Sequence, residues 1–306
     1  MQTKINVIDK EYIANGFANN VYLFKFKNKN YVYRETFGPP LNIKKIYAFF
    51  PLFKPFFTPN IIISTNAITY PFIEGNQLNL NLLSLKDEIR VFKKMGVVYR
   101  KIHNITHKRY LYKGNKFKSW SDLLNYKLDE ICIPENKKYI KILKKIWRER
   151  FINYSPQKRL LHGDFSPKNI ILHREKLKII DWDKFIVGDK YFELTNILSK
   201  MFVRSHGNFE MSIITDAFFE AYGKKELNKL ISTNDLYLFY SIYFLMEMYT
   251  RCIKSNSKIR EKQYENRIIF LIFKLSSKNR TKFLKTGDKM TPNLNPGEIK
   301  ILGHKK

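Results

Sequence analysis

The first seventy residues of the chain alternate apolar and polar positions, with the period of two that is typical of half-buried strands. The segments 21–26 and 31–34 predict two strands joined by a turn at 27–30, and the segments 60–65 and 67–73 predict a second pair. A small antiparallel sheet is therefore expected at the beginning of the chain.

Farther along, the apolar spacing becomes that of amphipathic helices. Ser84 begins a capping-box sequence, and the helix that follows it is predicted to run to about His103. Another helix is predicted over 137–151, and several more between 192 and 275. The pattern predicts an α+β protein in which a sheet-rich lobe leads, through a hinge near residues 70–77, to a larger helical lobe.

The length of 306 residues is enough for about two domains. We expect a first lobe over residues 1–73 and a helical lobe over 74–285. Residues 286–306 are rich in Lys, Asn, Pro and Gly, and we expect them to form a weakly ordered basic tail.

The charge of the chain is strongly positive, because 56 Lys and Arg residues face 27 Asp and Glu residues and give a net charge of +29. Such a charge bears on association with nucleic acid, phosphorylated partners or anionic lipid rather than on the fold. The basic residues are spread along the chain, as drift in an AT-rich genome would also produce. Drift and a selected binding surface both stay open, and no specific nucleic-acid partner is expected.

The two cysteines, Cys132 and Cys252, are far apart and lack metal-ligand spacing, so neither a disulfide framework nor a zinc site is expected. The N-terminus lacks the layout of a signal peptide, and no apolar run reaches the roughly 18–20 residues of a membrane span. We therefore expect a cytoplasmic protein that could rest peripherally on an anionic membrane surface.

The residues that carry chemistry surround a predicted hairpin, formed by the apolar runs 170–172 and 177–180. Asp164 and Asn169 stand before this hairpin and Asp181 stands directly after it, so their side chains can converge at its end. Phosphoryl transfer needs this combination, because a carboxylate must orient the attacking hydroxyl and hard oxygen donors must hold Mg²⁺ against the nucleotide phosphates.

The pattern His-x-Asp-x-x-x-x-Asn, followed by a hairpin and a further Asp, resembles the catalytic loop and metal-binding Asp of protein kinases. In the form HGDxxPxN…IDWD it is similar to the aminoglycoside phosphotransferase and choline kinase superfamily, and this resemblance implies the two-lobed protein-kinase-like fold. It also implies transfer of the γ-phosphate of ATP to a hydroxyl of a small molecule, such as an aminoglycoside, a choline-like amino alcohol or a sugar. Asp164 would act as the base, and Asn169 and Asp181 would hold Mg²⁺.

The resemblance covers about residues 12–198 and implies further contacts with the nucleotide. A loop at residues 16–22 resembles the loop that covers the phosphates, and the strand at 31–34 resembles the third strand, whose cation touches them. The segment 70–75 resembles the hinge that holds the adenine. The nucleotide-binding residues implied in this way are Gly16, Asn19, Arg34, Phe72, Ile73 and Glu74.

One part of the kinase pattern has no match in the sequence. Kinases normally hold the phosphate-binding cation with a glutamate on the small-lobe helix, but no acidic residue occurs between Thr36 and Ile73. Arg34 is therefore expected to stay hydrated without an acid partner and to give an elevated nucleotide KM, because the adjacent Glu35 points to the other face of the strand. Ser166 stands where protein kinases carry a lysine, which favours a small-molecule kinase.

Two other functions stay open at this point. One is a pseudokinase or binding module that keeps the fold without turnover, which the missing glutamate favours. The other is an envelope-associated kinase that acts on a glycolipid or polysaccharide precursor, which the basic surface favours. The role of Asp183 is open as well, between membership of the site and a solvated carboxylate in a turn.

Overall fold

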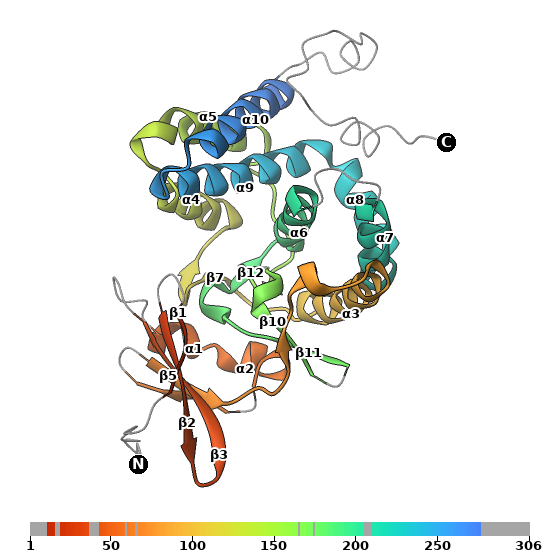
Figure 1. Cartoon of the computed structure of the whole chain (residues 1–306). Helices are drawn as coiled ribbons and strands as arrows, with labels where there is room; N and C mark the ends of the chain where they lie inside the picture. Colours follow the sequence, from red (N-terminus) through yellow and green to blue (C-terminus); the bar gives the residue numbers. More distant parts are fainter. Residues whose placement is uncertain are drawn as a thin grey trace. The chain divides into compact units, whose positions relative to one another are not determined.

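The structure is a computed structural model that describes residues 11–15, 19–36, 43–58, 60–64, 67–164, 166–173, 175–204 and 210–276. It contains two compact units, and most of their helices and strands are labelled in Figure 1. The first unit comprises Met1–Leu83, Lys101–Lys116 and Lys158–Val187, and the second comprises Ser84–Arg100, Phe117–Gln157 and Gly188–Lys306. The segment predicted to carry the chemistry thus belongs to the same unit as the N-terminal sheet. The lobe boundary at residue 73 stays a prediction, and the predicted tail at 286–306 lies outside the described residues.

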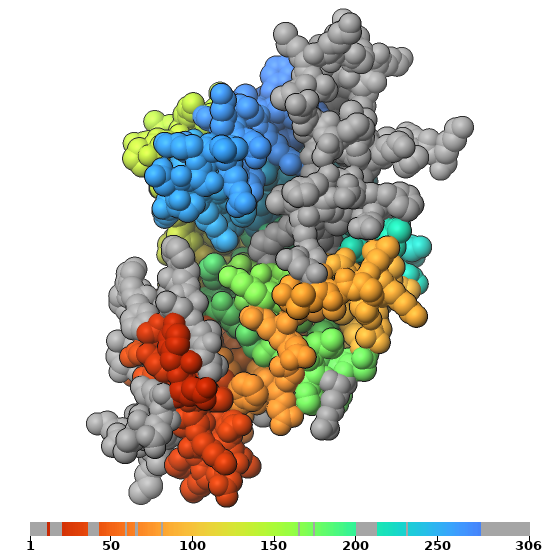
Figure 2. Space-filling view, in the orientation of Figure 1, coloured from red at the N-terminus to blue at the C-terminus, as the bar shows by residue number. Residues whose placement is uncertain are grey.

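The first unit begins with an antiparallel sheet of five strands in the order β1-β2-β3-β5-β4. The strands are β1 (Glu11–Asn15), β2 (Asn19–Phe26), β3 (Lys29–Thr36), β4 (Ile62–Ile63) and β5 (Ala67–Pro71). The predicted hairpin and the predicted second pair of strands are both present, as β2–β3 and β4–β5. Part of this sheet, coloured red, is open to solvent in the space-filling view (Figure 2). On β3, Val32 and Arg34 alternate toward the buried side.

Two short helices, α1 (Ile43–Tyr47) and α2 (Phe50–Phe53), follow β3. The ring of Phe53 stacks on that of Trp182, with centroids 4.8 Å apart and planes 6° from parallel, and both side chains are fully buried. This aromatic contact fixes α2 to the segment that carries the candidate metal-binding aspartate, and aromatic burial of this kind is a large source of stability.

The predicted hairpin at the centre of the unit is formed by β10 (Ile170–His173) and β11 (Lys176–Ile179), and β6 (Asn76–Gln77) adds a third strand beside β10. Gly75, just before β6, has a φ of +121°, and a Cβ atom there would overlap the carbonyl oxygen of Leu172. Glycine is therefore required where the predicted hinge meets the hairpin. A sheet in the order β8-β7-β12-β9 completes the strands, with β7 (Tyr110–Tyr112), β8 (Asn115–Phe117), β9 (Arg159–Leu161) and β12 (Ile186–Gly188).

The second unit is helical. Its helices are α3 (Leu85–His103, of which the last three residues belong to the first unit), α4 (Trp120–Glu130), α5 (Lys137–Arg150), α6 (Lys190–Arg204), α7 (Glu210–Tyr222), α8 (Lys224–Ser232), α9 (Asn234–Lys254) and α10 (Lys258–Ser276). The helices predicted at 137–151 and at 192–275 are confirmed. The predicted cap of α3 is present too, because the backbone nitrogen of Asp87 donates to Oγ of Ser84 at 3.2 Å.

A buried carboxylate organises the helical unit at the start of α6. Asp189 is 2% exposed and accepts hydrogen bonds from the hydroxyls of Tyr154 and Tyr240, both at 2.8 Å, and from the backbone nitrogen of Tyr191 at 3.0 Å. Burial raises the pKa of Asp189, and the three hydrogen bonds offset only part of this effect. Asp189 thus joins helices α6 and α9 through one acceptor group.

Candidate active site

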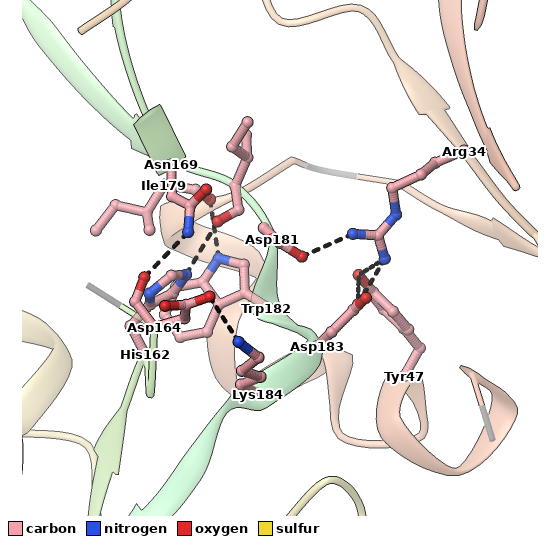
Figure 3. Close-up of polar contacts among 11 residues, drawn as sticks. Arg34, Tyr47, His162, Asp164, Asn169, Ile179, Asp181, Trp182, Asp183 and Lys184 are labelled. Carbon is pink, nitrogen blue, oxygen red and sulfur yellow. Dashed lines mark hydrogen bonds and ion pairs between the residues drawn. The ribbon is translucent and has the colours of Figure 1, made fainter. Parts of the chain in front are cut away.

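The three residues that the sequence predicts for chemistry lie at one end of the β10–β11 hairpin (Figure 3). The backbone nitrogen of Ile180 donates to the carbonyl oxygen of Asn169 at 2.8 Å, which extends the strand pairing by one step and leaves Asp181 next in the chain. Nδ2 of Asn169 in turn donates to the backbone carbonyl of Asp164 at 3.0 Å. The structure therefore brings Asp164, Asn169 and Asp181 together.

The loop before the hairpin is held by the two residues that precede Asp164. Nε2 of the buried His162 donates to the carbonyl oxygen of Ile180 at 2.9 Å. Gly163 has a φ of +81°, and a Cβ atom there would overlap the carbonyl oxygen of Lys184. Only glycine suits both this backbone conformation and this close approach. The histidine and glycine of the motif thus serve to position the loop.

Asp164 faces a cation that the sequence interpretation missed. Nζ of Lys184 lies 3.0 Å from Oδ2 of Asp164, and the carboxylate is largely shielded from solvent, with 17% of the side chain exposed. Lys184 follows the Ile-Asp-Trp-Asp motif directly, and that position is the only signal in the sequence that could have indicated it. A nearby cation favours the ionised form of a carboxylate, which is the form that can accept a proton.

The surroundings of Arg34 differ from the prediction. Its guanidinium is buried, with Nη1 2.8 Å from Oδ1 of Asp181 and Nη2 2.5 Å from Oδ1 of Asp183. The expectation of a hydrated arginine without an acid partner is therefore wrong. Its partners lie 147 and 149 residues farther along the chain and reach it through the tertiary fold, so a search of the neighbouring helix could not find them.

A tyrosine joins this pair. The hydroxyl of Tyr47 accepts a hydrogen bond from Nη2 of Arg34 at 3.3 Å and donates one to Oδ1 of Asp183 at 3.1 Å. Asp183 is 5% exposed, so it belongs to this cluster and is not a solvated turn carboxylate. The sequence interpretation missed Tyr47, although its spacing from Ile43 and Ile46 puts all three on one buried face of α1.

Burial and charge act in opposite directions within the cluster. Burial lowers the pKa of Arg34, but the negative charge of Asp183, followed by Tyr47 and Asp181, outweighs it and raises that pKa well above its ordinary value. Burial and the charge of Asp183 together raise the pKa of Tyr47 well above its ordinary value, against the opposing effect of Arg34. Tyr47 therefore keeps its proton and acts as a donor toward Asp183.

The nucleotide-binding residues implied by the resemblance are described only in part. Gly16 lies outside the described residues, and the backbone of Asn19 pairs with β3 at the start of β2. The backbone nitrogen of Phe72 donates to the carbonyl oxygen of Asn30 at 2.9 Å, and its ring is 37% exposed. Ile73 and Glu74 continue this partly exposed segment up to β6, which pairs with β10. The predicted hinge thus lies beside the hairpin that carries Asn169.

Comparison with known proteins agrees with this geometry. A model of the phosphotransferase enzyme family matches residues 11–227. The chain belongs to this family. No curated protein matches it. It acts as a phosphotransferase on an alcohol group, and no helix among the described residues is both long and apolar enough to cross a bilayer.

Solved structures show the same fold. The phosphotransferase is similar to a thermostable mutant of aminoglycoside phosphotransferase APH(4)-Ia in a ternary complex with AMP-PNP and hygromycin B, with a TM-score of 0.63, 11% identity, and coverage of 89% of this chain and 96% of that one. It is also similar to the gentamicin complex of APH(2")-IIa, with a TM-score of 0.61, 15% identity, and coverage of 87% and 92%. The predicted two-lobed protein-kinase-like fold is confirmed.

The polar atoms of this phosphotransferase fit a magnesium ion held jointly with a nucleotide. No group of three or more His, Cys, Asp and Glu side chains that could hold a metal occurs among the described residues, and Mg²⁺ characteristically uses one or two protein oxygens together with phosphates. Asn169 engages its amide nitrogen with Asp164, which leaves its amide oxygen for a cation. The side chain of Asp181 is 35% exposed, and its backbone is left-handed with a φ of +64°, a conformation that an aspartate tolerates better than most residues.

The site also contains a buried donor suited to an anion. Nε of Arg34 is buried without a hydrogen-bond partner among the described residues, and an unsatisfied buried donor is costly. A phosphate oxygen would satisfy it, because guanidinium groups bind phosphates through several parallel hydrogen bonds. The residues present thus fit a nucleotide phosphate as well as Mg²⁺.

Proposed function

We propose that this phosphotransferase moves the γ-phosphate of ATP to a hydroxyl group of a small molecule. The observation that carries the proposal is the arrangement of Asp164 at the end of the hairpin, between the amide of Asn169 and the ammonium of Lys184. A carboxylate so placed can orient an attacking hydroxyl and accept its proton, and such proton transfer contributes roughly 10²–10⁴-fold to a rate.

The other residues of the site would bind the nucleotide and its metal ion. Asn169 and Asp181 would hold Mg²⁺, which when bound neutralises charge on the phosphates. Arg34 would contact the phosphates as a fixed cation. The residues Phe72, Ile73 and Glu74 would hold the adenine, and the segment of Gly16 and Asn19 would cover the phosphates. Each of these roles follows from the match between this chain and the family pattern.

The acceptor belongs to the class of aminoglycosides, amino alcohols and sugars. Solved structures of the same fold hold gentamicin, kanamycin and hygromycin B, which supports a polar, hydroxyl-rich acceptor. We further propose that the enzyme works in the cytoplasm. Its net charge of +29 would allow contact with an anionic membrane surface, and co-sedimentation with anionic vesicles that weakens with salt tests that contact.

The proposed function is tested by incubating the purified protein with γ-labelled ATP, Mg²⁺ and a panel of aminoglycosides, amino alcohols and sugars. The expected result is a labelled acceptor whose formation requires Mg²⁺ and is lost in Asp164→Asn. If the protein binds Mg·ATP but labels no acceptor and does not hydrolyse ATP, a binding module replaces the kinase. Labelling that persists in Asp164→Asn would remove Asp164 from its role.

A further inference from the structure

A kinase-like site needs a carboxylate that holds its phosphate-binding cation in place. In protein kinases this carboxylate comes from a glutamate on the helix after the third strand. Here the corresponding segment contains helices α1 and α2 and no acidic residue. The cation, Arg34, is nevertheless buried in an ion pair, so its anchor must come from another part of the chain.

The two aspartates that contact Arg34 differ in burial. The side chain of Asp183 is 7% exposed, whereas that of Asp181 is 35% exposed. Oδ1 of Asp183 receives both Nη2 of Arg34, at 2.5 Å, and the hydroxyl of Tyr47, at 3.1 Å. Asp183 thus has the contacts of a fixed structural partner, while Asp181 stays accessible from solvent.

We propose that Asp183, supported by the hydroxyl of Tyr47, is the positioning residue that anchors Arg34 toward the nucleotide phosphates in place of the helix glutamate. This role rests on the proposed function, because it presumes that a nucleotide binds beside Arg34. Tyr47 is the helix residue that takes part. It lies on α1, and its hydroxyl contacts both the arginine and the aspartate (Figure 3).

The guanidinium of Arg34 can contact the anchoring aspartate and the phosphates at the same time, because it has several nitrogen donors. Nη2 faces Asp183 and Tyr47, while Nη1 faces Asp181 (Figure 3). A guanidinium presents its donors in a rigid plane, so anchoring one nitrogen also orients the other two. If Asp181 held Mg²⁺ instead, the contacts of Nη2 would remain, and Nη1 and Nε would be available to the phosphates.

The anchor is tested by calorimetric titration of AMP-PNP with Mg²⁺ into the wild type and two variants. Asp183→Asn keeps the shape of the side chain and removes its charge, and we expect the Kd to rise about tenfold, which corresponds to about 1.4 kcal/mol. Tyr47→Phe removes only the hydroxyl, and we expect a smaller rise of about threefold, because the direct ion pair between Arg34 and Asp183 remains. Tyr31→Phe is the matched control, because it removes a hydroxyl from the other face of the same strand as Arg34; its Kd should stay within about twofold of the wild type.

Steady-state kinetics with an acceptor separate anchoring from a general loss of structure. We expect the KM for ATP to rise in Asp183→Asn in proportion to the Kd while kcat falls less, since the reacting carboxylate Asp164 is untouched. In an Arg34→Met background, Asp183→Asn should add less than twofold to the Kd, because its only proposed task is gone. This double variant also removes the buried guanidinium, which in Asp183→Asn alone keeps Asp181 but loses its more buried partner. The double variant and Tyr47→Phe therefore decide the matter if that single variant fails to fold.

Different results would contradict different parts of the proposal. A Kd that is unchanged in Asp183→Asn, or that rises equally with and without Arg34, would overturn the anchor while leaving the proposed function in place. A Tyr47→Phe variant that behaves as the Tyr31→Phe control would remove Tyr47 from it. If the wild type itself binds no nucleotide, the proposed function fails and the anchor fails with it.

Discussion

Lys184 and Asp164 form an ion pair of 3.0 Å between two segments on either side of the β10–β11 hairpin. In protein kinases a lysine two residues after the catalytic aspartate lies close to it, and Ser166 occupies that position here. The ammonium therefore reaches Asp164 from beyond the hairpin instead of from within the loop. A cation thus stands beside Asp164, the proposed base, but a different part of the chain supplies it.

The first prediction concerns this pair. Lys184→Met should lower kcat by about 10- to 100-fold, because Asp164 loses the cation that orients its carboxylate. Lys184→Arg, which keeps a cation at this position, should restore part of the loss. Lys176→Met, on the exposed tip of the same hairpin, is the control. A kcat in Lys184→Met that equals that of the Lys176→Met control would show that Lys184 does not support Asp164.

The second prediction separates chemistry from binding at Asp164. Asp164→Asn should abolish detectable transfer, a loss of about 10³-fold or more, while the Kd for Mg·AMP-PNP stays near that of the wild type. The reason is that Asp164 contacts Lys184 and, in the proposed role, would act on the acceptor hydroxyl rather than on the nucleotide. Product formation and calorimetry measure the two effects, and comparable turnover in the variant would contradict the assignment.

The third prediction concerns the residues that would hold Mg²⁺. Asp181→Ala should weaken nucleotide binding strongly in the presence of Mg²⁺ and only slightly with the metal chelated, since its carboxylate would act through the ion. Asn169→Ala should show the same dependence with a smaller effect. Titrations of AMP-PNP with Mg²⁺ or EDTA check this. An equal loss under both conditions would assign Asp181 to holding Arg34 alone.

The fourth prediction concerns pH and the helical unit. Burial raises the pKa of Asp189 above its ordinary value of 3.8, so the folded protein holds this proton to a higher pH than the unfolded chain does. The folded state then binds more protons in that window, and the contribution of this group to the free energy of unfolding is fully present below pH 3.8 and lost as the pH rises through the raised pKa.

Asp189→Asn cannot titrate, so the stability of the wild type relative to this variant should fall as the pH rises above 3.8, by about 1.4 kcal/mol for each unit by which the pKa is raised. Urea unfolding between pH 3.5 and 7 measures the difference. Asp216→Asn, at an exposed position on α7, serves as the control. A difference that grows with pH would show that hydrogen bonding outweighs burial at Asp189.

The sequence predicted those parts of the site that depend on short spacings. The pairing of β10 with β11 follows from two apolar runs and a turn, and it alone places Asn169 beside the residue that precedes Asp181. The cap at Ser84 and the strands around Arg34 follow from equally local patterns. In these cases the interaction that forms the element and the pattern that reveals it involve the same few residues.

The missed contacts depend on the tertiary fold. The partners of Arg34 lie 147 and 149 residues away, and aromatic contacts such as the stacking of Phe53 on Trp182 bring their segment against the small helices. Lys184 reaches Asp164 because the glycine at 163 lets two backbones approach closely, which no periodicity records. Tyr47, Asp183 and Lys184 lie in the candidate site because distant segments of the chain pack together, and no local pattern indicates their contacts.

The ion pair between Arg34 and Asp181 has a thermodynamic consequence. Without ligands, Arg34 and Asp181 bind each other. A phosphate that binds Nη1 of Arg34 would free the carboxylate of Asp181, and a cation that binds Asp181 would free Nη1 of Arg34. Either ligand therefore lowers the cost of admitting the other, and by linkage the effect is equal in both directions. Metal and nucleotide should accordingly bind with positive cooperativity, and without either of them Arg34 and Asp181 neutralise each other's charge.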